Sequence, residues 1–241
     1  MSRSFALIDG VRRGRATAIV TGAAAGLLAL AIAVHGGTGG TGFDRHVDSW
    51  FGAHVGYSTA LWFADLGSEP VVSLLVAAAV AACVALGSAR GAVLAVVGPL
   101  LAAGLTEYVL KPIVDRRLYG YYAFPSGHTA GFGSVMLVVV IVLLGPARGR
   151  LRTPVRRGGI TAALLLALGC MLGLIAAQFH YATDVIGGLF LVLASVIAVA
   201  LAIDAVGDRL ARNRSPGNPS ASDARTDLPQ VREERTEQRR A

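Results

Sequence analysis

The sequence predicts an all-α membrane protein, a six-transmembrane-helix bundle with an interfacial helix between helices 1 and 2. Hydrophobic residues make up 54% of the chain and charged residues only 15%, a balance typical of membrane proteins. Several long stretches carry no charge at all. About 18 apolar residues, at about 1.5 Å of helix rise per residue, approach the thickness of the hydrocarbon core of a bilayer.

The first predicted span covers residues 17–34, and we interpret it as a retained anchor because further spans follow it. The same criterion gives spans at residues 70–87, 91–110, 127–145, 160–179 and 185–203. The third of the six contains Glu107, whose carboxylate is costly in lipid unless it has a partner. Lys111, the only lysine of the chain, lies four residues later on the same helical face and is the predicted partner.

The segment between the first two spans, residues 35–69, is long but not hydrophobic enough to cross a membrane. Large apolar residues recur there at helical spacing, and charged residues lie on the opposite face. The two sets are Phe43, Val47, Trp50, Phe51 and Val55, and Asp44, Arg45 and Asp48. This pattern predicts a helix that lies in the membrane interface. We favour a role in capping the bundle over a role in guiding a lipid headgroup.

The basic residues predict the orientation, because short cytoplasmic segments carry the excess of Lys and Arg. Thirteen of them fall on one side of the predicted spans and four on the other. The thirteen are Arg3, Arg12, Arg13, Arg15, Arg90, Arg148, Arg150, Arg152, Arg156, Arg157, Arg209, Arg212 and Arg214. The four are Arg45, Lys111, Arg116 and Arg117. We therefore expect a multi-pass protein of the cell membrane with both termini in the cytoplasm.

Three segments follow from this interpretation: a basic cytoplasmic N-terminus (1–16), a membrane core (17–203) and a disordered cytoplasmic tail (204–241), whose polar composition cannot bury a core. The net charge of +7 is explained by anionic lipid headgroups at the inner face rather than by nucleic acid. Cys83 and Cys170 lie inside predicted spans, so we interpret them as packing residues. We expect no metal and no cofactor. The oligomeric state stays open.

The candidate site lies on the predicted outer side, where three groups of polar residues converge. Lys111, Arg116 and Arg117 offer cations for phosphate oxygens. Ser126, Gly127 and His128 begin a predicted helix, whose free N–H groups bind anions. His180 and Asp184 are spaced so that a carboxylate orients an imidazole. Each group alone also fits an ordinary helix end or interface anchor, but together they indicate phosphoryl transfer.

These motifs resemble those of the type 2 phosphatidate phosphatase superfamily, whose signature is K-x6-R-P, P-S-G-H and S-R-x5-H-x3-D. Residues 125–128 match the second motif in full, and His180 with Asp184 match the end of the third. The resemblance implies a phosphohistidine on His180, oriented by Asp184, with His128 protonating the leaving oxygen. It implies that Lys111, Ser126 and Gly127 hold phosphate, and that no metal is needed.

The sequence departs from the family signature at both phosphate-binding arginines. Leu118 stands at the first position, and Gly173 and Leu174 stand at the Ser-Arg pair. Arg116 and Arg117 are then the predicted substitutes.

Two functions stay open at this point. The first is a phosphatase acting on a membrane lipid at the outer leaflet. Polyprenyl diphosphate is the first choice. The Arg-, Ala- and Val-rich composition is typical of a high-GC bacterium, where recycling of a carrier lipid at the outer leaflet is a common need. Phosphatidate, phosphatidylglycerophosphate and a polyprenyl phosphosugar phosphate are the other substrates considered. The second function is a six-helix lipid-phosphate binder or transporter without catalysis.

Overall fold

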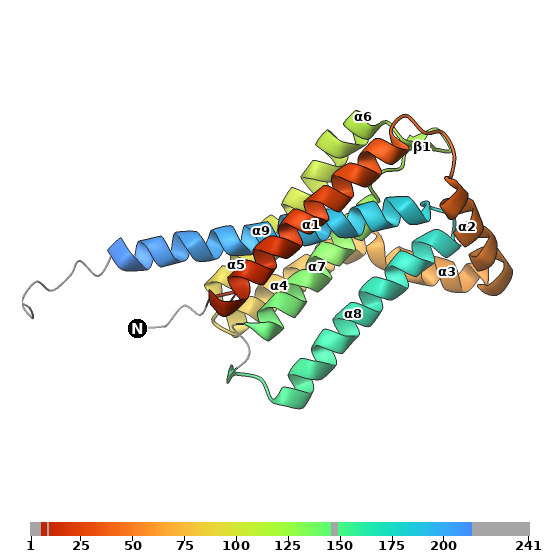
Figure 1. Ribbon diagram of the computed structural model, residues 1–241. Helices are drawn as coiled ribbons and strands as arrows, with labels where there is room; N and C mark the ends of the chain where they lie inside the picture. The colour runs from red at the N-terminus through yellow and green to blue at the C-terminus, as the bar shows by residue number, and fades with distance from the viewer. Residues whose placement is uncertain (1–5, 9, 146–148, 214–241) are drawn as a thin grey trace, which may run out of the picture. The chain divides into compact units, whose positions relative to one another are not determined.

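The computed structural model describes residues 6–8, 10–145 and 149–213. The elements of this part of the chain are α1 (Gly10–Val34), α2 (Gly42–His54), α3 (Tyr57–Ala64), η1 (Asp65–Gly67), α4 (Glu69–Ala85), α5 (Ala89–Gly104), η2 (Leu105–Leu110), α6 (Lys111–Val114), β1 (Arg117–Leu118), β2 (Tyr121–Tyr122), α7 (Gly127–Leu144), α8 (Thr153–Ala176) and α9 (Ala182–Asn213) (Figure 1). The prediction of an all-α membrane protein is confirmed. A two-stranded hairpin is the one addition among the described residues.

The chain divides into two units, residues 1–205 and 206–241. The architecture below concerns the first unit, and the described part of the second is the end of α9. That helix continues past residue 203, where the predicted core ends, to Asn213. The predicted disorder of the tail otherwise concerns residues 214–241, which lie outside the described residues, as do Arg3 and Arg148.

Within the described ranges, five helical segments are long and apolar enough to cross a membrane: residues 12–34, 89–114, 127–144, 153–176 and 182–213. The remaining predicted span, residues 70–87, corresponds to α4, which meets this criterion only together with the α3–η1 segment. The two parts are bent by 49° at Ser68. Pro70 in the first turn of α4 suits this break, because a proline at a helix start removes only an N–H that has no partner there.

Helix α7 is the central element of the bundle and contacts α4, α5 and α8. Its residues Phe132, Val135 and Met136 belong to an apolar cluster with Leu174 of α8 and Val185 of α9. Burial of such side chains in a close-packed interior fixes the relative positions of the three helices. The N-terminus of α7 is thereby held beside the turn that joins α8 to α9.

Glycine 173 allows α3 to approach α8 closely. A Cβ atom at this position would lie 2.6 Å from the Cβ of Phe63 and 2.8 Å from the backbone nitrogen of Ala64. A larger residue would therefore displace α3. A serine at this position would meet the same obstacle.

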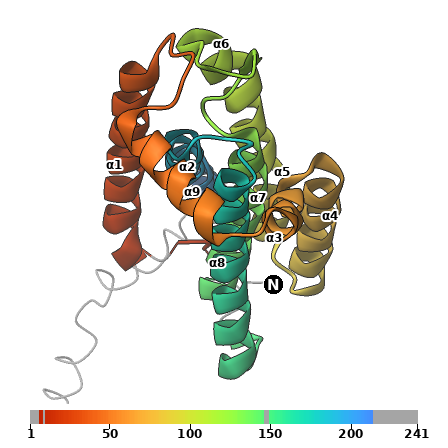
Figure 2. The ribbon, with the colours of Figure 1, turned by 90° about the vertical axis from the view of Figure 1, so that its right-hand side faces the viewer.

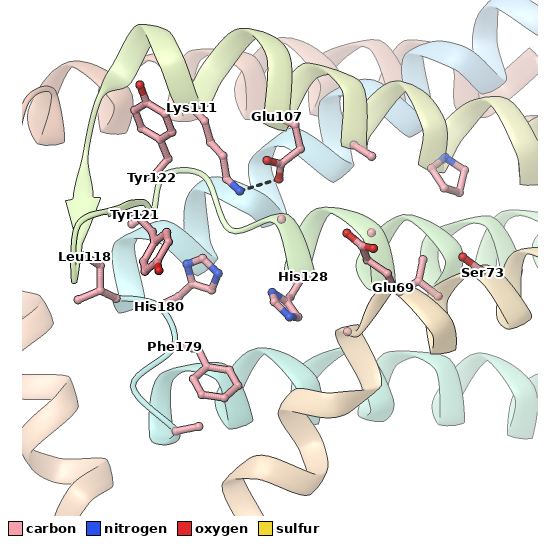
Figure 3. Close-up of a pocket in the computed structure, with 18 of the residues that line it drawn as sticks. Glu69, Ser73, Glu107, Lys111, Leu118, Tyr121, Tyr122, His128, Phe179 and His180 are labelled. Carbon is pink, nitrogen blue, oxygen red and sulfur yellow. Dashed lines mark hydrogen bonds and ion pairs between the residues drawn. The ribbon is translucent and has the colours of Figure 1, made fainter.

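The segment between α6 and α7 turns sharply twice. Asp115 ends α6 in the left-handed region, with φ of 49°. The antiparallel strands β1 and β2 then pair Arg117 with Tyr122, and the turn residues Tyr119 and Gly120 have φ of 52° and 85°. Two positive φ values are the mark of a type I′ hairpin turn. Leu118, Tyr121 and their neighbours are thus brought over the start of α7 (Figure 3).

Candidate active site

The two predicted catalytic histidines come from distant parts of the chain and face one cavity (Figure 3). His128 lies in the first turn of α7, and His180 lies in the turn before α9. Their ring centroids are 5.9 Å apart, with the ring planes at 64°. Ser126 caps α7 by accepting a hydrogen bond of 3.3 Å from the N–H of Thr129. The two rings are in edge-to-face contact, so both can reach the same small anion when it lies beside them in the cavity.

The cavity has a volume of about 1170 Å³, and it combines a polar end with an apolar arm. The polar end is lined by Lys111, Tyr119, Tyr121, Gly127, His128 and His180. The arm along α4 and α5 is mostly apolar, and it is lined by Val72, Val76, Val96, Pro99 and Leu100 beside the polar Glu69 and Ser73. One continuous space thus has a polar region beside the histidines and a mostly apolar region beside α4 and α5.

His180 is nearly buried, with 9% of its surface exposed. Burial, followed by the positive charges of His128 and Lys111, lowers the pKa of His180 to about 3. The imidazole is consequently neutral at neutral pH, the state in which a ring nitrogen carries a lone pair for attack. Its Nδ1 has no hydrogen-bond partner among the described residues, and it lies 3.9 Å from Oδ2 of Asp184.

Asp184 is fully buried at the start of α9. Its Oδ1 accepts a hydrogen bond of 2.6 Å from Arg116, and its Oδ2 accepts one of 3.1 Å from the N–H of Tyr181. The N–H of Ser126 donates to the Asp184 carbonyl oxygen at 3.0 Å. This backbone bond joins the two histidine motifs directly.

Arg116 does not line the cavity, and its predicted role as a phosphate ligand needs correction. Only 1% of the residue is exposed, because its guanidinium lies between the carboxylates of Asp44, at 2.7 Å, and Asp184, at 2.6 Å. It also donates to Thr183 and stacks on the ring of Tyr181. Without this guanidinium two buried carboxylates would lack their shared cation, which is strongly unfavourable, so the residue is part of the support beneath the site.

Arg117 also lies outside the cavity lining. Its guanidinium pairs with Asp115 at 2.9 Å and lies 4.5 Å from the ring centroid of Tyr122, and 42% of its side chain is exposed. The strand pairing of β1 directs the neighbouring Leu118, rather than Arg117, to the cavity. Arg117 is thus a rim residue in this structure.

Lys111 lines the cavity as predicted and forms the expected ion pair with Glu107, at 2.6 Å (Figure 3). Glu107 belongs to η2, a stretch of π-helix of the kind found at functional sites. Gly127 lies close to this pair: a Cβ there would be 2.9 Å from Oε1 of Glu107, so a larger residue would displace the end of the Glu107 side chain. Glu69 of α4 adds a second carboxylate to the lining.

The two leucines at the family arginine positions have different surroundings. Leu118 lines the cavity. Leu174 is fully buried in the apolar cluster between α7, α8 and α3, where an unpaired guanidinium would be strongly unfavourable. The sequence reasoning did not identify Asp44 and Thr183, which complete the buried network around Arg116. The polar face noted on the interfacial helix was the only signal for Asp44.

Comparison with protein families decides the identity of the fold. Residues 70–207, more than half of the chain, match the model of the PAP2 superfamily. The chain belongs to the PAP2 superfamily. It is a membrane lipid phosphatase of that family, whose phosphatases are metal-independent phosphohydrolases. Comparisons with curated proteins and with solved structures gave no match.

Proposed function

We propose that this PAP2 protein hydrolyses a lipid phosphate or diphosphate at the outer leaflet through a phosphohistidine on His180. The observation that carries the proposal is the meeting of a buried, neutral His180 with His128, at 5.9 Å between ring centroids, across a cavity that continues into an apolar arm. The same cavity thus contains the proposed nucleophile His180, the proposed acid His128 and apolar side chains that can contact a lipid chain.

In the first step His180 attacks phosphorus with Nε2, because Nδ1 is the nitrogen nearest Asp184. The P–N bond forms as the P–O bond to the lipid breaks, and His128 gives a proton to the departing oxygen. Water then attacks phosphorus with His128 as base, the P–N bond breaks, and inorganic phosphate leaves. Both displacements spread charge over the equatorial oxygens.

The negative charge on the equatorial oxygens is stabilised by groups at the start of α7 and on α6. Lys111 supplies a cation, and the N–H of Gly127 lies in the first turn of α7, where the helix dipole is positive. Ser126 is completely buried as the cap of this helix, so its contribution comes through the orientation of these N–H groups. Lys111 must exchange part of its bond with Glu107 for phosphate oxygens when substrate binds.

Asp184 stabilises the positive charge that develops on His180 during the attack. The 3.9 Å between Nδ1 and Oδ2 is longer than a hydrogen bond, and catalytic hydrogen bonds are often long without substrate and shorten in the reacting complex. A rotation of the ring that brings the two atoms about 1 Å closer completes the pair.

Polyprenyl diphosphate stays the first choice of substrate because of the Arg-, Ala- and Val-rich composition, and the apolar lining along α4 and α5 suits a hydrocarbon chain of any of these lipids. Phosphatidate, phosphatidylglycerophosphate and a polyprenyl phosphosugar phosphate fit the same chemistry. Orientation rests on the distribution of arginines, and a reporter fused to the C-terminus tests it, with an external signal refuting the outward-facing site.

A non-catalytic lipid-phosphate binder is the second candidate. It is favoured by one observation: among the described residues that line the cavity, Lys111 is the only lysine or arginine. Phosphate release from a panel of these lipids by purified protein, compared with His180→Ala and with a mock purification, separates the candidates. Release by the wild type alone, with an acid-labile phosphoenzyme, supports catalysis. Equal release by wild type and variant removes it.

A further inference from the structure

Asp44 is a fully buried carboxylate on α2, outside residues 70–207 that match the family. It has a local task, since it completes a capping box with Thr41 at the start of its helix. A capping box alone needs only that contact. The other bonds of Asp44 extend across the chain to the residues that support the catalytic pair.

Both oxygens of Asp44 accept hydrogen bonds, and the hydroxyl of Thr183 lies within reach of both, at 2.9 Å and 3.0 Å. Oδ1 accepts from the N–H and the hydroxyl of Thr183, both at 2.9 Å. Oδ2 accepts from Arg116 Nη2 at 2.7 Å, in addition to the N–H and hydroxyl of Thr41. Hydrogen bonds from Thr183, Thr41 and Arg116 outweigh the effect of burial and lower the pKa of Asp44 below its usual value. The Asp44 side chain is therefore a carboxylate anion, and each of its two oxygens accepts hydrogen bonds.

These contacts reach Asp184 along two routes. Thr183 precedes Asp184 in the chain, so the bond from its N–H to Asp44 fixes the backbone where α9 begins. Arg116 links the carboxylates directly, because its Nη2 binds Asp44 while its Nη1 binds Oδ1 of Asp184. Oδ2 of Asp184 is not bound by Arg116, and it lies 3.9 Å from Nδ1 of His180. Figures 1 and 2 show α2 beside the start of α9.

We propose that Asp44 is a positioning residue of the active site: by engaging Nη2 of Arg116 and the N–H of Thr183, it leaves one oxygen of Asp184 available to His180. Without Asp44, Asp184 is the only carboxylate left on Arg116 among the residues that the structure describes. An arginine with a single carboxylate partner prefers two parallel bonds to both of its oxygens. Oδ2 would then exchange its bond of 3.1 Å from the N–H of Tyr181 for one from Arg116, and it would turn away from His180.

The inference rests on the proposed phosphohistidine chemistry, and the test keeps the two separable. Asp44→Asn is expected to lower kcat roughly 10- to 100-fold, the loss typical of residues that orient a reactive group through another. KM is expected to stay within about twofold, because Asp44 does not line the cavity. The assay uses whichever lipid phosphate of the panel is turned over fastest.

Asp48→Asn is the matched control. Asp48 lies one turn further along α2 and is also partly buried, and its Oδ1 has no hydrogen-bond partner among the described residues. It therefore receives the same chemical change on the same helix without breaking the link to Arg116. Turnover by Asp48→Asn is expected to equal that of the wild type.

A double-mutant cycle with Asp184→Asn separates positioning from general destabilisation. If Asp44 acts through Asp184, the Asp44→Asn loss in kcat disappears in the Asp184→Asn background. Losses that multiply, or an Asp44→Asn protein that turns over like Asp48→Asn, overturn the proposal. Should the Asp184→Asn rate be too low to measure, the kcat and KM of Asp44→Asn against Asp48→Asn decide.

Thr183→Val covers the case in which Asp44→Asn does not fold. It removes one hydroxyl from the network but keeps both carboxylates and the backbone N–H, and a smaller loss in kcat at constant KM is expected. An unchanged kcat overturns the proposal. His180→Ala is measured in parallel: if it retains full turnover, the phosphohistidine chemistry itself is wrong, whereas an inactive His180→Ala with a fully active Asp44→Asn refutes only the role of Asp44.

Discussion

Replacing Arg116 with methionine should destabilise the protein rather than weaken phosphate binding directly. The side chain is 1% exposed, and both of its carboxylate partners, Asp44 and Asp184, are completely buried. Arg116→Met keeps an unbranched side chain of similar reach but leaves two buried anions without their shared cation. Breaking a buried ion pair in this way costs about 3–5 kcal/mol.

That cost translates into a fall in unfolding temperature of roughly 6–20 °C, at about 2–4 °C per kcal/mol for a chain of this size. Thermal unfolding in detergent, followed by intrinsic tryptophan fluorescence, measures it. Arg117→Met is the control, because its pair with Asp115 is exposed on both sides and an exposed pair contributes at most about 1 kcal/mol. The two neighbouring arginines should therefore differ clearly.

The reasoning is refuted if Arg116→Met unfolds at the same temperature as Arg117→Met while its KM for the lipid phosphate rises. Such a result would mean that the guanidinium turns into the cavity in the working protein, as the sequence interpretation first held. Loss of activity accompanied by the expected loss of stability agrees with a supporting role.

Three further predictions concern the cavity and its supports. Lys111→Met should lower kcat/KM roughly 10²- to 10³-fold at an unchanged unfolding temperature, since its one ion pair is with the half-exposed Glu107. The pKa of His180 is lowered to about 3 in the folded protein, so at pH values between about 6.5 and 3 the unfolded chain binds a proton that the folded protein does not. The free energy of unfolding should therefore fall as the pH falls through this range. Denaturant titration measures this dependence, which should be shallower in His180→Ala. Gly187→Ala should cost about 1–3 kcal/mol, seen as a lower unfolding temperature, because its Cβ would overlap the ring of Phe124.

The sequence was sufficient for features that depend on local patterns. Uncharged runs placed the helices, and Ser126 was recognised as a helix cap from its position before an apolar run. The i, i+4 spacing paired Lys111 with Glu107. The meeting of His128 and His180 followed from locating both at the same end of the bundle.

The position of Arg116 could not be predicted in the same way. Its partner Asp44 lies 72 residues earlier, and nothing local distinguishes an arginine that faces a cavity from one that faces a buried carboxylate. Asp44 was placed on the charged face of a helix lying in the membrane interface, whereas its side chain is fully buried against Arg116 and Thr183. The positive φ of Tyr119 and the resulting hairpin were also missed, although Gly120 was a signal for a turn.

Helix α9 is fixed along its length by two buried carboxylates, and this limits how the protein can move. Asp184 is bound near one end, and Asp204, 20 residues later, accepts bonds from the backbone N–H groups of Leu7 and Ile8 and from Arg90. The two anchors are about 30 Å apart at about 1.5 Å per residue. A sliding or rotation of α9 would break both sets of bonds at once. A movement that widens the cavity and keeps these bonds would have to come from other helices of its wall, such as α4 and α5.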